Sequence, residues 1–161
     1  MKIAGAVLTL AVAFASHAAE PVYLDQLMET PLATLQTQFP GLEREGCYSI
    51  GGGRYVLISM DRKDGRPWRV AVTSEQPCRR PDDAGVLEVR QRHGVQLGDK
   101  TITVLEKMGR PDASSSPEPK LEKLGEIEYF YVCRVSEQCA RHNSVFIKDG
   151  VVTAMAEWYS E

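Results

Sequence analysis

The side chains that could do chemistry are few, and they do not form a recognisable catalytic group. Beyond residue 18 the histidines are His93 and His142, and neither lies in a spacing typical of a catalytic or metal-binding motif. The sequence contains no nucleophile elbow, no HExxH motif and no glycine-rich dinucleotide loop. Glu126 and Glu128 could pair across a site, yet their spacing first indicates solvent-facing positions. The sequence therefore predicts no catalytic residues, no enzymatic activity and no cofactor.

Aromatic and arginine side chains on the expected strands point instead to binding. Tyr129 and Tyr131 share one face of a strand by their period-two spacing, whereas Phe130 faces the other way. Tyr, Trp and Arg are the residues that dominate protein interfaces. The candidate partner-binding residues are therefore Trp68, Arg69, Tyr129, Tyr131 and Trp158. The alternative that both tryptophans belong to the core stays open, because the sequence does not indicate which sheet face the helices cover.

The first 18 residues have the pattern of a cleaved secretory signal. Lys2 supplies a short positive region, residues 3–15 are apolar, and Ser16 and Ala18 form a small-x-small cleavage site. The apolar run is too short for a comfortable membrane span, and no similar run follows it. We therefore expect a periplasmic or secreted protein without a membrane anchor. The formal net charge of −3 gives no reason to expect a nucleic-acid partner.

All four cysteines, Cys47, Cys78, Cys133 and Cys139, lie beyond this signal. An even number of cysteines in an exported chain is typical of disulfide bonds, here two, which can be paired in three ways. A metal site made from Cys133, Cys139 and His142 is the alternative, but no fourth ligand stands at a recognisable spacing. We therefore expect two disulfide bonds and no metal.

The first half of the chain has the pattern of a helix pair followed by three strands. Apolar residues recur at helical spacing at Leu24, Leu27, Met28, Leu32, Leu35 and Phe39. Pro31 interrupts this pattern, and because proline is tolerated in a first turn, a second helix should begin there with Thr30 as its N-cap. Segments rich in β-branched and aromatic residues predict strands at residues 46–50, 54–60 and 68–73. The polar, proline-bearing residues 74–85 are expected to join the two halves.

The stretch at residues 94–112 predicts one short, well-delimited helix. Its buried face should consist of Ile102, Val104, Leu105 and Met108. Asp99 can cap the first amides, Gly109 suits a left-handed C-terminal position, and Pro111 prevents the helix from continuing. A surface loop should follow at residues 112–120. The clearest strand patterns then come at residues 126–134, 139–148 and 151–159, the last two joined by the tight-turn dipeptide Asp149-Gly150.

The two halves show a weak internal repetition. In each half, a helix and strands are followed by a Lys-Asp-Gly turn and a strand that contains tryptophan. The turn and the tryptophan are Lys63-Asp64-Gly65…Trp68 in the first half and Lys148-Asp149-Gly150…Trp158 in the second. The expected organisation is a signal peptide (residues 1–18), a first repeat (19–80) and a second repeat (81–161). Units of this size have marginal cores, so one disulfide in each would help. On that ground we favour the pairs Cys47–Cys78 and Cys133–Cys139.

Several of these features resemble two families of small exported domains, the SmpA/OmlA (BamE-like) group and the secreted beta-lactamase-inhibitor-protein (BLIP) family. The matching positions are Leu97-Gly98 at the helix entry, Val104 and Met108 on its face, Gly109-x-Pro111 at its end, and the strand run at residues 144–158. Members of both groups pack a helical pair on an antiparallel sheet, and they bind other proteins. One departure is Lys100, which stands where members often have a Ser or Thr cap, so Asp99 must take that role here.

The resemblance implies an α+β fold of two tandem helix-plus-sheet repeats, which is closer to the BLIP family than to the single-domain BamE-like proteins. It implies an exported protein-binding module whose partner is a specific envelope protein. One hypothesis is an inhibitor or immunity protein that blocks an enzyme or toxin; the other is a BamE-like envelope-assembly or structural component. BamE-like members carry a lipid-anchoring cysteine directly after the signal, and here no cysteine precedes Cys47. This difference favours the inhibitor or immunity role.

Overall fold

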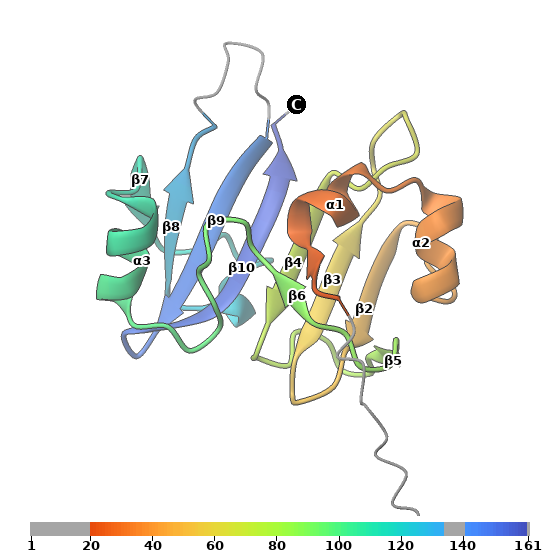
Figure 1. Ribbon diagram of the computed structural model, residues 1–161, viewed down its shortest axis with the longest axis horizontal. Coiled ribbons are helices and arrows are strands. Elements are labelled where there is room, and N and C mark those ends of the chain that lie inside the picture. The colour runs from red at the N-terminus through yellow and green to blue at the C-terminus, as the bar shows by residue number, and fades with distance from the viewer. Residues whose placement is uncertain (1–19, 134–140, 161) are drawn as a thin grey trace, which may run out of the picture.

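One eight-stranded sheet dominates the computed structural model, which describes residues 20–133 and 141–160 (Figure 1). Neighbouring strands run antiparallel, except that the edge strand β5 is parallel to β2. In spatial order the strands are β5 (Asp82–Asp83), β2 (Glu45–Ser49), β3 (Tyr55–Ser59), β4 (Arg69–Thr73), β10 (Val151–Tyr159), β9 (Arg141–Lys148), β8 (Ile127–Tyr131) and β7 (Ala113–Ser115). The described residues add three short α-helices to this sheet, so the fold is α+β, as the sequence predicts. The expected signal peptide lies outside the described residues.

The pairing of β4 with β10 joins strands from the two halves of the chain into this one sheet. The register runs from Ala154 opposite Thr73 to Trp158 opposite Arg69. Residues more than 80 positions apart thus form the centre of the sheet. A separate two-stranded parallel pair, β1 (Val22–Tyr23) with β6 (Val89–Arg90), also connects the start of the chain to its middle.

Three helices cover one face of the sheet: α1 (Leu24–Glu29), α2 (Leu32–Gln38) and α3 (Thr101–Met108) (Figure 1). Helix α1 packs on β4 and β10, at the junction of the two halves. Alternate residues of the strands meet the helices, as period-two geometry requires. The buried core on this face includes Leu24, Met28, Leu35, Phe39, Tyr48, Val56, Ile58, Val70, Val72, Val104, Val145, Ile147 and Met155. We call this side of the sheet the covered face.

Helix α3 lies where the sequence predicts it, but two details of that prediction are wrong. Ile102 is 59% exposed, so the buried face is formed by Val104 with the partly buried Met108. Asp99 does not cap the helix: its carboxylate accepts hydrogen bonds from the Gln96 amide (3.0 Å) and from Lys107 Nζ (2.8 Å). Lys100 occupies the N-cap position without a side-chain hydrogen bond.

The start of α3 is held instead by the β9–β10 turn. The amide and the hydroxyl of Thr101 both donate to the Gly150 carbonyl, at 3.0 Å each. Asp149 and Gly150 have positive φ values of 52° and 76°, which confirms the predicted tight turn. The turn that orders the last hairpin therefore also fixes the position of the helix.

The connecting segments contain more structure than their composition predicts. The segments 74–85 and 112–120, expected as a junction and a loop, contribute the edge strands β5 and β7. These edge strands are only two and three residues long, too short for a periodic pattern to indicate them.

The predicted N-cap of the second helix is wrong. Thr30 ends α1 rather than capping α2, whose N-cap is Pro31.

The disulfide Cys47–Cys78 is present, with a Cα–Cα distance of 6.6 Å, as predicted. It ties β2 to the segment that leads into β5. The second expected bridge involves Cys139, which lies outside the described residues, and stays a prediction. Within the described part of the chain, no helix has the length and hydrophobicity needed to cross a membrane.

Removing this bridge should lower stability considerably. Its two cysteines are 31 positions apart, and closing a loop of that length stabilises the folded chain by roughly 3–4 kcal/mol in the chain-entropy model. We expect the double variant Cys47→Ala/Cys78→Ala to lose about that much free energy of unfolding in urea titrations. A loss below about 1 kcal/mol would mean that the unfolded chain is not constrained by this bridge.

Candidate binding cleft on the open sheet face

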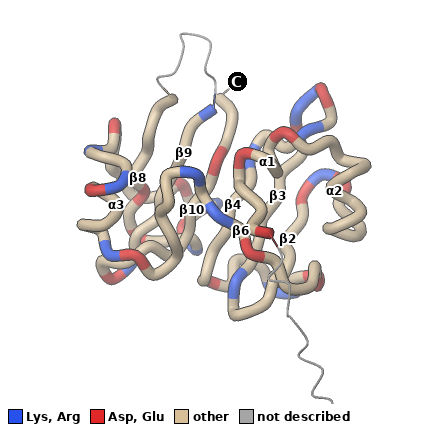
Figure 2. Tube along the Cα trace, viewed as in Figure 1, with Lys and Arg blue, Asp and Glu red and all other residues tan. Residues whose placement is uncertain are grey.

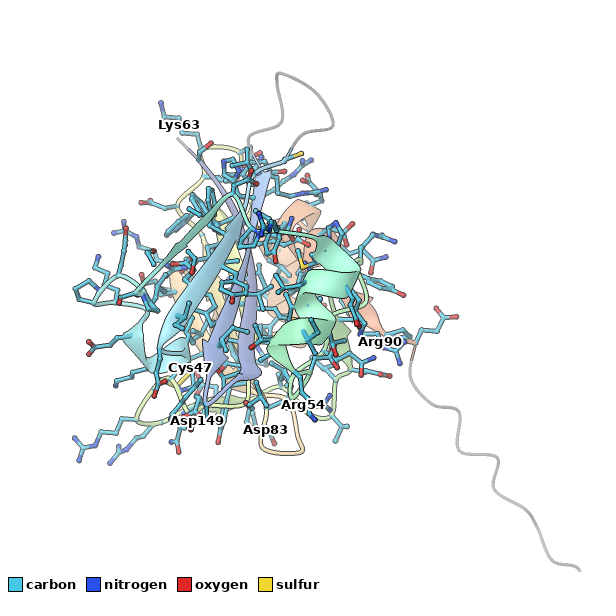
Figure 3. All side chains as sticks on the ribbon, turned by 90° about the vertical axis from the view of Figure 1, so that its left-hand side faces the viewer. Cys47, Arg54, Lys63, Asp83, Arg90 and Asp149 are labelled. Atoms are coloured by element: carbon cyan, nitrogen blue, oxygen red, sulfur yellow. A yellow bond between two sulfur atoms is a disulfide. The ribbon has the colours of Figure 1, made fainter. Side chains whose placement is uncertain are left out.

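No α-helix of the described residues lies on the sheet face opposite α1, α2 and α3, and we call this face the open face. Its strand residues are the alternate set, among them Leu57, Arg69, Ala71, Glu128, Phe130, Ser144, Phe146, Ala154, Ala156 and Trp158. The short 3-10 helix η1 (Glu122–Leu124) and the loop before it pack on part of this face through Leu121 and Leu124. In the side view of Figure 3 the green α3 lies on the side of the sheet away from this loop.

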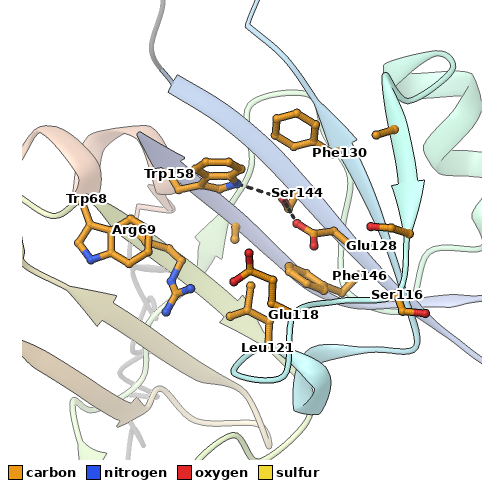
Figure 4. Close-up of a pocket in the computed structure, with 13 residues that line it drawn as sticks. Trp68, Arg69, Ser116, Glu118, Leu121, Glu128, Phe130, Ser144, Phe146 and Trp158 are labelled. Atoms are coloured by element: carbon orange, nitrogen blue, oxygen red, sulfur yellow. Dashed lines mark hydrogen bonds between the residues drawn. The ribbon is translucent and has the colours of Figure 1, made fainter. Parts of the chain in front are cut away.

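A cleft of about 400 Å³ lies between this loop and the open face. Its lining combines large apolar side chains with a few charged ones (Figure 4). The residues that matter most for its chemistry are Trp68, Arg69, Glu118, Leu121, Glu128, Phe130, Ser144, Phe146 and Trp158. The volume is within the range of small-molecule sites, and the mixture of apolar walls with few polar groups is typical of them.

The indole of Trp158 is the fixed wall of the cleft. It stacks on Phe130, with ring centroids 5.3 Å apart and an interplanar angle of 28°, and it packs against the His142 ring at 5.0 Å. Trp158 Nε1 donates a hydrogen bond to Ser144 Oγ (3.1 Å), and Ser144 Oγ donates to Glu128 Oε1 (2.5 Å). This chain of hydrogen bonds satisfies the indole N–H and orients the ring.

Arg69 supplies the positive charge of the cleft. Its Cζ lies 4.6 Å from the centroid of the Trp68 ring, close enough for a cation–π interaction. Within the described residues its guanidinium makes no hydrogen bond and no ion pair. Burial lowers the pKa of Arg69 from its usual value, and the more distant carboxylates of Glu45, Glu118 and Glu128 oppose that shift only in part.

The structure divides the five predicted binding residues between the two faces. Trp68, Arg69 and Trp158 meet at the cleft. Tyr129 and Tyr131 lie on the covered face: Tyr131 is 8% exposed, and its hydroxyl donates to the Gly109 carbonyl at 3.3 Å. Burial raises the pKa of Tyr131 to about 12. These two tyrosines share a face as predicted, but it is the face that the helices cover.

Sequence reasoning missed several cleft residues. The sequence predicts only that Phe130 points away from the two tyrosines, and this alternation is the signal for its place on the open face. Ser144 and Phe146 alternate in the same way along β9. Glu118 belongs to a loop, where no periodic pattern indicates a direction.

The polar groups of the cleft lack the arrangement that a nucleophilic site needs. Ser144 is 1% exposed, and its oxygen accepts the indole N–H while donating to Glu128, so it cannot reach a substrate. His142 is buried against the rings, and burial lowers its pKa. His93 is exposed. Among the described residues no group of three or more His, Cys, Asp or Glu is placed to hold a metal ion.

Comparisons of the chain with protein-family models, with curated proteins and with solved structures gave no match. We therefore infer the function from the fold and the cleft.

The buried carboxylate of Glu157 is expected to make the free energy of unfolding depend on pH. It lies in β10, is 3% exposed, and its Oε2 is 3.6 Å from Arg141 Nε. Burial raises its pKa from 4.5 to about 7, and Arg141 offsets that only in part. Above pH 4.5 the unfolded chain releases this proton while the folded chain retains it until about pH 7. The free energy of unfolding should therefore fall across this interval, by up to about 3 kcal/mol.

Replacing Glu157→Gln should remove this fall and stabilise the protein at pH 8 more than at pH 5. Urea unfolding at both pH values measures it, with the exposed Glu126→Gln as the matched control. An undiminished difference between the two pH values in the Glu157 variant would show that other groups cause it.

Proposed function

We propose that the protein is an exported, non-enzymatic binding protein that docks a specific envelope protein on its open face, as an inhibitor or immunity protein that blocks an enzyme or toxin. The observation that carries this proposal is the group of Trp68, Arg69 and Trp158 on the open face, which no α-helix in the described part of the chain covers. Trp and Arg are enriched among the residues that dominate binding energy at protein interfaces.

The surroundings of this group support a protein partner. A second, wider hollow adjoins the cleft and shares Trp68 and Trp158 with it. Its other lining residues are mostly charged and of both signs: Arg44, Glu45, Asp61, Arg62, Lys63, Asp64 and Lys120. Opposite charges meet in the hairpin loop between β3 and β4 (Figure 2). An aromatic centre with a polar, charged rim is the usual anatomy of a specific interface.

The proposal includes the tandem-repeat architecture. The two Lys-Asp-Gly segments precede Trp68 and Trp158, and the β4–β10 register places Trp158 opposite Arg69, directly after Trp68. Each half of the chain thus contributes one tryptophan to the same surface. The disulfide Cys47–Cys78 supports an oxidising, exported location, in agreement with the signal pattern.

Alanine substitution of either tryptophan should weaken partner binding. The partner would first be captured on immobilised protein from an envelope extract of the producing cell, and its affinity then measured by calorimetry. We expect Trp68→Ala or Trp158→Ala to cost at least about 2 kcal/mol of binding free energy, since central tryptophans are frequent hot spots. Tyr129→Ala is the matched control: it removes an aromatic ring from the covered face and should leave the affinity of the folded protein unchanged.

Unchanged affinity in both folded tryptophan variants would refute the open face as the interface. If the captured partner is an enzyme or toxin, stoichiometric addition of the protein should abolish its activity. Hydrolysis of an envelope substrate by the purified protein, with no partner captured, would contradict the proposed class.

A further inference from the structure

The guanidinium of Arg69 is the one cation in the cleft lining; it lies over the Trp68 ring, and within the described residues no carboxylate is close enough to form an ion pair with it. Arginine presents a planar fork of donors that matches a carboxylate with two parallel hydrogen bonds. Arg69 is only half-buried and lines the cleft, so its donors stay available to the carboxylate of a ligand that enters. Figure 4 shows this group pointing toward the interior of the cleft.

The rest of the cleft is suited to an apolar group. Trp158 and Phe130 form one stacked aromatic wall, and Leu121 and Phe146 add apolar surface. The indole N–H of Trp158 is already used by Ser144, so this wall offers a ring face rather than a donor. An occupant should therefore combine an anionic end with an aromatic or branched aliphatic body.

The two carboxylates of the cleft do not substitute for that anion. Glu128 is held by the Ser144 hydroxyl, and no ion pair joins it to Arg69 in the described chain. Glu118 lies on the exposed loop before η1, and within the described residues it forms no ion pair with Arg69, so its charge acts on the guanidinium only at a distance. They also define the opposite possibility, a cationic ligand between Glu118 and Glu128, which predicts mutational effects of the opposite sign.

We propose that this cleft is a binding site for a small amphiphilic carboxylate, whose anionic group pairs with the Arg69 guanidinium and whose apolar body packs against Trp158 and Phe130. The cleft volume of about 400 Å³ holds a molecule of one ring and a short chain. This site does not require the protein partner of the proposed function. Its failure would leave the protein interface standing, and the reverse also holds.

Three probes of nearly equal shape test the proposal: phenylbutyrate, its neutral amide phenylbutyramide, and the cation phenylbutylamine. The two tryptophans of the chain, Trp68 and Trp158, both line the cleft, so intrinsic fluorescence reports occupancy directly. We expect saturable binding of phenylbutyrate with a Kd at least tenfold lower than that of the amide, since a charge-assisted pair replaces a neutral one. Equal affinity for acid and amide, or no saturable binding of the acid, would overturn the proposal.

Variants test whether Arg69 is the residue that recognises the carboxylate. Arg69→Gln should reduce the affinity for the acid to that for the amide, whereas Arg69→Lys, which keeps the charge but not the fork, should retain part of the preference. Glu118→Gln should raise the affinity for the acid a few-fold by removing a nearby negative charge. Arg110→Gln is the matched control, because it removes one positive charge from an exposed residue that lines neither the cleft nor the wider hollow beside it.

Circular dichroism and thermal unfolding establish that each variant is folded before its affinity is compared. If Arg69→Gln does not fold, Arg69→Lys and Glu118→Gln still decide the matter through the sign of their effects. Tighter binding of phenylbutylamine than of phenylbutyrate, together with weaker binding in Glu118→Gln, would assign the cleft to a cation and refute the proposal.

Discussion

The pairing of β4 with β10 is the constraint on which the rest of the structure depends. It joins the strands of the first and second halves into one sheet, and α1 packs across the same junction. Because Trp158 lies opposite Arg69 in this register, the tryptophans at positions 68 and 158 come together on the open face. A shift of one residue in this pairing would turn Trp158 and Ala156 toward the helices, so the register that buries Val70 and Met155 also creates the binding surface.

The sequence is sufficient to predict the positions of the helices and strands that have strong periodic patterns. The helices near residues 24–38 and 101–108 and the long strands fall where apolar spacing and turn residues predict them. The sequence does not show whether a strand side chain points toward the helices or away from them, because a strand pattern indicates which residues share a face but not which face is covered. Tyr131 and Phe130 illustrate this. The sequence predicts that they point to opposite faces, but only the packing of the helices determines that Tyr131 is in the interior and Phe130 lines the cleft.

The cleft itself could not be predicted, because it arises from contacts between distant segments. Its walls come from β4, β7, β8, β9 and β10, and the loop containing Glu118 and Leu121 encloses it. That loop is rich in serine and proline, a composition that carries no information about where it packs. The prediction that Asp99 caps α3 is wrong for a similar reason. The Gly150 carbonyl, 49 residues away from Thr101, takes the place expected of the Asp99 carboxylate.

The two ends of the sheet have a consequence for the behaviour of the protein at high concentration. A sheet edge with unpaired backbone groups is a template on which other chains can add strands, and the hazard grows with the length of the edge. Here the sheet ends in β5 and β7, strands of two and three residues with exposed side chains. One end carries the adjacent negative charges of Asp82 and Asp83, which repel an identical edge. The long hydrophobic strands are thus confined to the interior of the sheet, which protects the protein against self-association through backbone pairing and leaves its side chains as the means of recognition.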